Sequence, residues 1–264
     1  MPSPDLQRNR DSWHELSRFT SARIALGRAG GSCRTETLLE LRAAHARARD
    51  AVQKPFQVEA LEANFQRAGL ETFRLTTLAD NRHCFLVRPD LARQLSETSR
   101  RSLFENQASW GRRDLAVIVS DGLSALAAER QAPPTLAALL PALREAGWTV
   151  YPVFVVPYGR VKLQDEIGEL LGARQTLMLL GERPGLESPD SLGAYCTFGP
   201  RADRTDADRN CVSNIRPEGL PPEEAGQKLA RLLLASARLG ISGVAFKDRD
   251  LTASASRAKT LPLP

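Results

Sequence analysis

The chain has 264 residues, 42% of them hydrophobic and 25% charged, which is ordinary for one sizeable globular domain with a smaller appended unit. No apolar run approaches the roughly 18 residues of a membrane-spanning helix, and residues 1–10 are too polar for a secretory signal, so we expect a cytoplasmic protein. The formal net charge of +5 is spread among acidic residues, which argues against a nucleic-acid-binding face and is compatible with an anionic ligand or an acidic partner subunit.

The cysteines and histidines predict neither a zinc site nor a disulfide framework. The cysteines are far apart in sequence and form no Cys-x-x-Cys pair, so we expect reduced thiols. They are Cys33, Cys84, Cys196 and Cys211. The histidines, His14, His45 and His83, all lie in the first third of the chain. We therefore assign no metal ligand and no catalytic residue to this chain.

The first third of the chain is predicted to be mainly helical. Apolar residues recur at helical spacing over residues 11–26, and a glycine-rich basic loop follows. A second helix is expected from Thr35, and a third runs to residue 67 after a break at Pro55. The pattern is extended from Thr72 and helical again over residues 91–107. Residues 1–110 are therefore expected to form an N-terminal helical arm or subdomain.

Residues 111–245 are predicted to form an α/β domain, because short apolar runs alternate with helical ones. Strands are expected over residues 115–119, 148–156 and 175–180, and helices over residues 123–130, 133–146 and 161–171. This alternation predicts a mostly parallel, Rossmann-like sheet flanked by helices on both faces. An edge strand (194–198), a loop (199–214) and a final helix (223–239) should follow, and residues 246–264 are expected to be disordered.

Three loops follow the expected parallel strands and should meet at one edge of the sheet: residues 120–124, 158–162 and 181–185. Arg160 and Lys162 stand near the start of a helix, where cations are disfavoured unless an anion binds there. The plainer interpretation, which we favour for two isolated charges, is that they pair with Asp165 and Glu166 of the same helix. Asp121 would ordinarily be the N-cap of the next helix.

Other residues of this edge also have plain interpretations. Glu182 and Arg183 could form a salt-bridged turn, and Cys211 alone would be a small buried filler. The chain has neither Gly-x-Gly-x-x-Gly nor Gly-x-x-x-x-Gly-Lys-[Ser/Thr], so dinucleotide or nucleoside-triphosphate binding by those motifs is unsupported. The convergence of the loops, more than any single residue, predicts a ligand site.

Several longer motifs resemble a known family. They are Val119-Ser-Asp-Gly-Leu-Ser124, Tyr158-Gly-Arg-Val-Lys162, Gly181-Glu-Arg-Pro-Gly-Leu186 and Ala207-Asp-Arg-Asn-Cys-Val-Ser-Asn-Ile215, together with Ala22-Arg-Ile-Ala-Leu-Gly-Arg-Ala-Gly30. In this order they resemble the small (light) subunit of ethanolamine ammonia-lyase, from about residue 10 to residue 240.

The resemblance implies an adenosylcobalamin-dependent radical enzyme that converts ethanolamine to acetaldehyde and ammonia. It implies a hetero-oligomer with a large TIM-barrel subunit that holds the substrate, with the corrinoid between the subunits. By motif, the cobalamin-contacting residues are Val161, Glu182 and Cys211. The chain lacks the Asp-x-His-x-x-Gly motif of enzymes that replace the lower base, so a base-on cobalamin is expected.

Two alternatives stay open at this point. One is a structural or regulatory subunit that caps a partner's barrel without touching the cofactor. The other is a free-standing enzyme for a phosphorylated or nucleotide-sugar ligand, suggested by Arg160 and Lys162. The family resemblance also allows a place within a bacterial microcompartment, although the chain starts almost directly at the helical arm.

Overall fold

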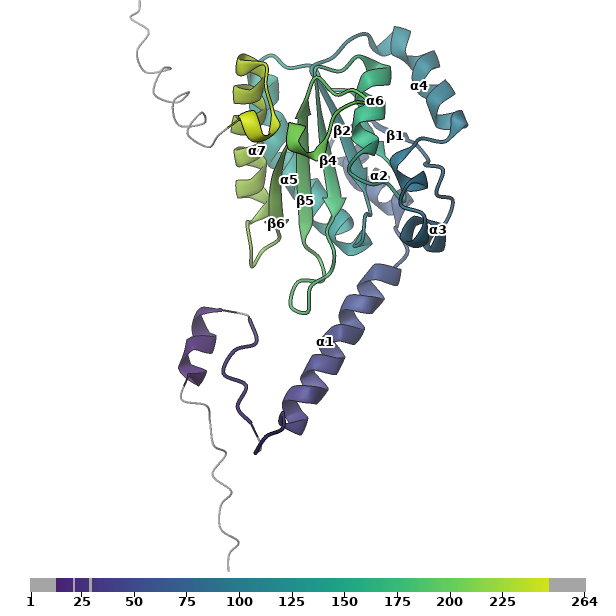
Figure 1. Cartoon of the computed structure of the whole chain (residues 1–264). Coiled ribbons are helices and arrows are strands. Elements are labelled where there is room, and N and C mark those ends of the chain that lie inside the picture. Colours follow the sequence, from purple (N-terminus) through teal and green to yellow (C-terminus); the bar gives the residue numbers. More distant parts are fainter. Residues whose placement is uncertain (1–12, 21, 29, 247–264) are drawn as a thin grey trace, which may run out of the picture.

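The computed structural model describes residues 13–20, 22–28 and 30–246. A six-stranded sheet with helices on both faces forms the body, and one helix extends away from it (Figure 1). The helices are α1 (Thr35–Gln53), α2 (Val58–Arg67), α3 (Arg82–Val87), α4 (Glu97–Trp110), α5 (Ala125–Glu145), α6 (Leu163–Leu171) and α7 (Pro222–Leu239). Short 3-10 turns lie at η1 (His14–Phe19), η2 (Leu91–Arg93), η3 (Asp206–Asp208) and η4 (Gly243–Ala245). None of the helices in these ranges is long and apolar enough to cross a membrane.

The sheet is mixed, whereas a mostly parallel, Rossmann-like sheet was expected. Its strands are β1 (Thr72–Arg74), β2 (Leu115–Ser120), β3 (Val153–Val155), β4 (Gln175–Gly181), β5 (Leu192–Phe198) and β6 (Arg209–Ile215), in the spatial order β1-β3-β2-β4-β5-β6. The first four are parallel to one another, and β5 and β6 are antiparallel to their neighbours. The reason is that a loop without a helix joins β4 to β5, so the chain turns straight back beside β4.

Strand β6 occupies part of the segment that was expected to be a loop. Only Arg209, Val212 and Ile215 of this strand are buried, so its sequence has little of the apolar alternation that marks a strand. Its presence makes β5 an interior strand, where an edge strand was predicted. Cys211 consequently lies on a strand beside β5, and not in a loop.

Helices cover both faces of the sheet, but one face is covered only in part. On one side the apolar residues of α2, α5 and α7 pack over β2 to β6, including Ala194, Cys196 and Val212. On the other side α4 and α6 pack over β2, β3 and β4, and Tyr195 is the contribution of β5 to that cluster. Because Cys211 and Ser213 of β6 are exposed, this side of the β5–β6 ladder is open to solvent.

Helix α5 is continuous, although two helices were predicted, the second of them beginning at Pro133. Its apolar side packs along its length on the sheet and on α7. A Cβ atom at Gly226 of α7 would lie 2.6 Å from the carbonyl oxygen of Thr135, so the two backbones are in close contact. This packing keeps α5 a single helix despite the prolines, whose destabilising effect is confined to the neighbouring turn.

The N-terminal part is helical only from Thr35. The helix expected over residues 11–26 is limited to η1, while the predicted break at Pro55 is confirmed between α1 and α2. Helix α3 was not predicted, and α4 begins at Glu97 behind an N-cap formed by Ser96. Strand β1 belongs to the main sheet, and Leu61 and Phe65 of α2 belong to its core. A domain boundary at residue 110 stays a prediction, and residues 247–264 of the predicted tail lie outside the described residues.

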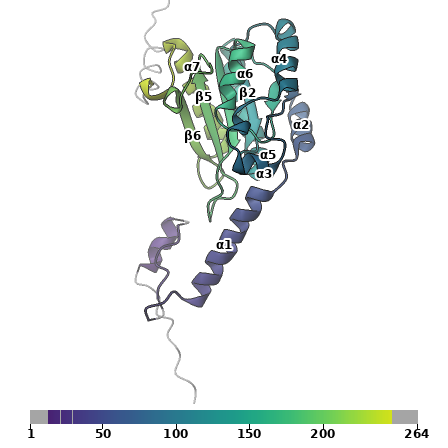
Figure 2. The ribbon, with the colours of Figure 1, turned by 45° about the vertical axis from the view of Figure 1, so that its right-hand side comes forward.

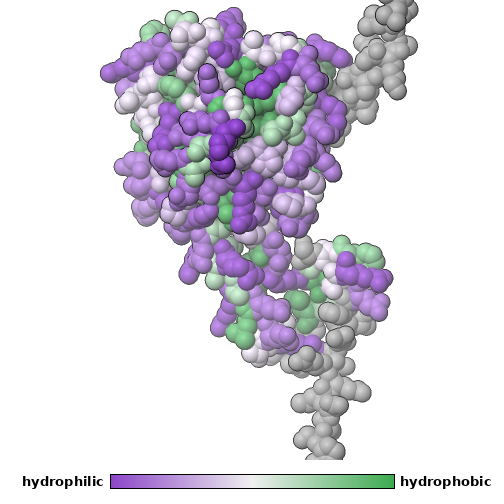
Figure 3. All heavy atoms as spheres, turned by 180° about the vertical axis from the view of Figure 1, so that it is seen from behind, coloured by the Kyte–Doolittle hydropathy of each residue, from purple (hydrophilic) through white to green (hydrophobic). Residues whose placement is uncertain are grey.

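Helix α1 extends from the body (Figure 2). It carries exposed apolar side chains. Seen from behind, hydrophobic surface appears along this arm among polar atoms (Figure 3). More than half of the exposed large hydrophobic side chains in the described ranges lie within residues 13–41. They are Trp13, Leu16, Phe19, Leu26, Leu38, Leu39 and Leu41.

Candidate functional site

The three loops at the carboxyl ends of β2, β3 and β4 lie side by side, as expected. The backbone N–H of Gly159 donates to Ser120 Oγ at 2.9 Å, and the N–H of Leu123 donates to the carbonyl oxygen of Gly181 at 2.9 Å. A Cβ atom at Gly122 would lie 2.3 Å from that same oxygen, so the loops after β2 and β4 require a glycine at their contact. The topology thus brings these loops to one edge of the sheet.

Asp121 fixes this edge, and it does not cap α5. Its buried carboxylate accepts the N–H of Tyr158 at 2.7 Å and pairs with Arg82 of α3 at 3.0 Å. The N-cap of α5 is Ser124, whose hydroxyl accepts the N–H of Ala127. Burial raises the pKa of the Asp121 carboxyl to about 6, against the opposing effect of Arg82. No pattern in the sequence indicated the role of Arg82.

A cavity of about 770 Å³ opens between the loop after β3, the segment 89–93 and the open side of β5 and β6, and the loops after β2 and β4 do not line it. Val161 and Cys211 both line it, so two of the three predicted contact residues share one cavity. Its other lining residues are Pro89, Arg93, Arg160, Lys162, Tyr195, Arg204, Thr205, Asp206 and Arg209. The segment 89–93 and residues Tyr195, Arg204 and Arg209 were not singled out from the sequence, because they are brought here only by the turns of the chain.

Glu182, the third predicted residue, lies beside the cavity. Its Oε2 accepts the hydroxyl of Ser191 and the N–H of Asn214, the latter at 3.3 Å. A Cβ atom at Gly193 would lie 2.9 Å from Glu182 Oε1 and 3.1 Å from the ring of Tyr195, so the two side chains are neighbours. Tyr195 in turn pairs with Cys211 across the β5–β6 ladder.

The Tyr195 side chain therefore connects Glu182 with Cys211 along the open side of the sheet. Burial, together with the nearby Cys211 and Glu182, raises the pKa of the Tyr195 hydroxyl. The phenol stays protonated near neutral pH and can donate a hydrogen bond.

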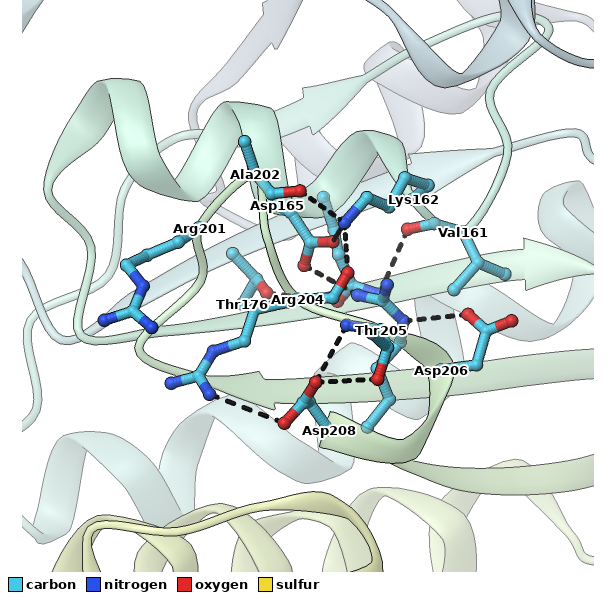
Figure 4. Close-up of polar contacts among 12 residues, drawn as sticks. Val161, Lys162, Asp165, Thr176, Arg201, Ala202, Arg204, Thr205, Asp206 and Asp208 are labelled. Atoms are coloured by element: carbon cyan, nitrogen blue, oxygen red, sulfur yellow. Dashed lines mark hydrogen bonds and ion pairs between the residues drawn. The ribbon is translucent and has the colours of Figure 1, made fainter.

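A buried ion-pair network joins the start of α6 to β6 (Figure 4). Asp165 of α6 is paired with Lys162 at 3.0 Å and with Arg209 of β6 at 2.6 Å. Arg209 Nε also lies 3.3 Å from Asp206 Oδ1. Lys162 further donates to the carbonyl oxygens of Ala202 and Arg204. The plain interpretation of Lys162 is confirmed: it pairs within its own helix and holds the loop before β6.

Arg160 does not pair with Asp165 or Glu166, which corrects that interpretation. Glu166 instead accepts the N–H of Leu95 and pairs with Arg100. The Arg160 guanidinium lies 4.2 Å from the ring centre of Phe85, and its Nη2 donates to the Phe85 carbonyl oxygen at 3.3 Å. Its buried Nε has no hydrogen-bond partner among the described residues.

A second unused donor belongs to Arg209, another residue of the cavity wall. Arg209 Nη2 is buried and has no hydrogen-bond partner within the described ranges, although Nη1 and Nε are both engaged. The cavity thus combines an open strand pair, an excess of cations and two buried donors without acceptors. Both donors are inaccessible to solvent, and unpaired buried donors are costly.

The sequence comparisons assign the chain to a family. Residues 10–247 match the family model of the ethanolamine ammonia-lyase light chain (EutC). The chain belongs to the ethanolamine ammonia-lyase light-chain family. The resemblance inferred from the sequence motifs is therefore confirmed.

Relatives named ethanolamine ammonia-lyase small subunit match across most of their length. The relative from Azotobacter vinelandii is 52% identical over 237 residues, covering 89% of this chain and 88% of that protein. The relative from Xanthomonas campestris pv. campestris is 50% identical over 240 residues, covering 90% and 88%. The relative from Ralstonia nicotianae is 49% identical over 237 residues, covering 89% and 88%. The matched region contains both the cavity and the arm.

Within the described ranges, no group of three or more His, Cys, Asp or Glu side chains could hold a metal ion.

Proposed function

We propose that the chain is the small subunit of an adenosylcobalamin-dependent ethanolamine ammonia-lyase, which converts ethanolamine to acetaldehyde and ammonia. In this proposal the cobalamin lies between this chain and a large TIM-barrel subunit that holds the substrate. The observation that carries it is the cavity on the open side of β5 and β6, which contains Val161 and Cys211 and has Glu182 beside it.

The residues of the cavity fit a corrinoid. A cobalamin carries amide side chains around its ring and one phosphodiester in its nucleotide loop, so it offers many hydrogen-bond acceptors. The cavity is lined by the guanidinium groups of Arg93, Arg160 and Arg204 and by Tyr195, whose protonated hydroxyl can donate. A volume of about 770 Å³ encloses a drug-sized molecule, and a cobalamin is much larger. This chain can therefore cover only one part of the cofactor, which supports a partner on the other side.

Each carried-over residue can have a separate role. Val161 presents an apolar side chain at the start of α6, and exposed Cys211 offers a small surface on the open strand. Glu182 can accept hydrogen bonds from corrin amides or ribose hydroxyls through Oε1, because its two hydrogen bonds engage Oε2. When bound, adenosylcobalamin supplies a radical by homolysis of its cobalt–carbon bond, and the protein positions and shields it. We propose the base-on form and assign no catalytic residue to this chain.

The N-terminal arm supports the existence of a partner chain. Exposed apolar side chains gathered on one projecting segment are typical of protein–protein interaction sites. The large subunit is the partner that the family's small-subunit name implies. Location in the cytoplasm, inside or outside a microcompartment, stays a prediction.

The test is cobalamin affinity of the complex of this chain with its large subunit, measured for wild type, Glu182→Ala and the control Glu105→Ala. Glu105 is exposed on α4, away from the cavity. Loss of one hydrogen-bond acceptor should weaken binding about 5- to 50-fold for Glu182→Ala, and Glu105→Ala should match wild type. A subunit that only caps the barrel predicts equal affinity for all three proteins. Turnover by the isolated chain would instead support the free-standing enzyme.

A further inference from the structure

The cations that line the cavity fall into two groups. Three of them have carboxylate partners: Lys162 pairs with Asp165, Arg204 with Asp208, and Arg209 with Asp165 and Asp206. Arg160 and Arg93 have no ion-pair partner within 4.0 Å among the residues the structure describes. These two lie together at the end of the cavity formed by η2 and the loop before α6.

Arg160 is held in place by uncharged contacts. Its backbone N–H donates to the carbonyl oxygen of Ala92 at 2.9 Å, which connects it to the turn that carries Arg93. The guanidinium packs on Phe85, and Nη2 is used by the Phe85 carbonyl oxygen. A guanidinium fixed in this way loses little side-chain freedom when a ligand binds, while its Nε remains buried and unused.

The local charge balance also calls for an anion. Burial lowers the pKa of Arg160, and the nearby cations Arg93, Arg82 and Arg183 lower it further. Asp121 is the carboxylate that acts against them, and it is already engaged by Arg82 and by the N–H of Tyr158. Like charges gathered around one half-buried guanidinium are unfavourable unless a ligand supplies negative charge.

We propose that Arg160 and Arg93 bind the phosphodiester of the corrinoid's nucleotide loop. This inference rests on the proposed function, because it assigns one part of the cofactor to one end of the cavity. The phosphodiester is the anionic group at the periphery of a cobalamin, since the corrin side chains are neutral amides. A planar guanidinium suits phosphate because it can donate two parallel hydrogen bonds.

The test compares two corrinoids on the complex of this chain with its large subunit. Adenosylcobinamide lacks the nucleotide loop and therefore the phosphodiester, whereas adenosylcobalamin has it. Equilibrium dissociation constants for both are measured by absorbance titration, without substrate, for wild type, Arg160→Gln, Arg93→Gln and the control Arg144→Gln. Arg144 is exposed on α5, on the opposite side of the sheet.

Arg160→Gln should weaken adenosylcobalamin binding about 10- to 100-fold, because one charge-assisted hydrogen bond is lost. Arg93→Gln should weaken it about 3- to 10-fold, because Arg93 is exposed and its charge is screened. Adenosylcobinamide should bind all four proteins within about threefold of one another. Arg93→Gln is also the variant whose fold should stay intact, because an exposed residue of a 3-10 turn can be replaced with little effect on stability. A loss of binding in this variant cannot then be explained by misfolding.

Two results would overturn the assignment. One is an equal loss of affinity for both corrinoids in Arg160→Gln. That result would mean that Arg160 maintains the conformation of the loop and does not bind the phosphodiester. The other is unchanged adenosylcobalamin binding in both arginine variants. A wild-type complex that binds neither corrinoid would instead overturn the proposed function itself.

Discussion

Replacing Asp165 by Asn tests how the wall of the cavity is held together. The Asp165 side chain is 1% exposed and receives Arg209 at 2.6 Å and Lys162 at 3.0 Å. Arg209 comes from β6 and is itself 3% exposed, whereas Asp165 lies in the first turn of α6. The substitution therefore leaves a buried guanidinium without its buried counter-ion.

The expected loss follows from this burial. Removing one partner of a buried ion pair costs about 3–5 kcal/mol, because the other charge remains desolvated. Arg209 keeps Asp206, but the Asp206 side chain is 97% exposed, and an exposed partner contributes only about 0–1 kcal/mol. We expect the free energy of unfolding to fall by about 3 kcal/mol for Asp165→Asn. The melting temperature should fall by about 6–12 °C for a chain of this size.

Chemical denaturation and calorimetry of the purified chain measure this change. The control is Asp203→Asn, which breaks an exposed pair with Arg201 and should cost less than about 0.5 kcal/mol. The double variant Asp165→Leu with Arg209→Met should be more stable than Asp165→Asn, because no buried charge is left unpaired. A loss below about 1 kcal/mol for Asp165→Asn would refute the reasoning.

Three further predictions concern titration, packing and assembly. The pKa of Asp121 is raised on folding to about 6 from 3.8, so its contribution to stability is greatest at low pH and is lost as pH rises through about 6. Relative to Asp121→Asn, the unfolding free energy of wild type should fall by about 2–3 kcal/mol between pH 4 and pH 7. The measurement is urea unfolding of both proteins at several pH values, and an equal dependence of the unfolding free energy on pH in the two proteins would contradict the prediction. Gly226→Ala should destabilise the chain by about 1–3 kcal/mol, since the new methyl group would meet a carbonyl oxygen of α5, whereas Gly31→Ala, with open space around it, should change the melting temperature little. Leu39→Glu on the arm should leave the melting temperature of the chain unchanged and weaken association with the large subunit at least about tenfold, measured by gel filtration at falling concentration. Leu239→Glu, at an exposed leucine far from the arm in sequence, is the matched control, and equal association of both variants would count against the arm as the contact surface.

The interior of the fold could be predicted from the sequence because its pattern is local. Strands β2 and β4 are fully buried apolar runs, and they were expected to within one residue at their C-terminal ends. The breaks at Pro55 and Gly172 were also recognised, because proline and left-handed glycine end helices by their own backbone chemistry. The family followed from long motifs, which are likewise read directly from the chain.

The errors occurred where a distant contact overrides the local pattern. The prolines of α5 suggest two helices, yet packing against α7 maintains one. Strand β6 has a polar sequence because one of its sides is open, and only its pairing with β5 shows that it is a strand. That pairing also changes the sheet from mostly parallel to mixed.

The residues of the site also fall into those that could be named from the sequence and those that only the fold could show. The sequence by itself determined which residues stand at strand ends, and so Val161, Glu182, Arg160 and Lys162 could be named from it. Only the tertiary structure decided that Lys162 has a buried ion-pair partner and that Arg160 has no such partner among the described residues. The physical reason is that turn and strand preferences depend on neighbours along the chain, whereas charge balance depends on which segments the fold places within a few ångströms of each other.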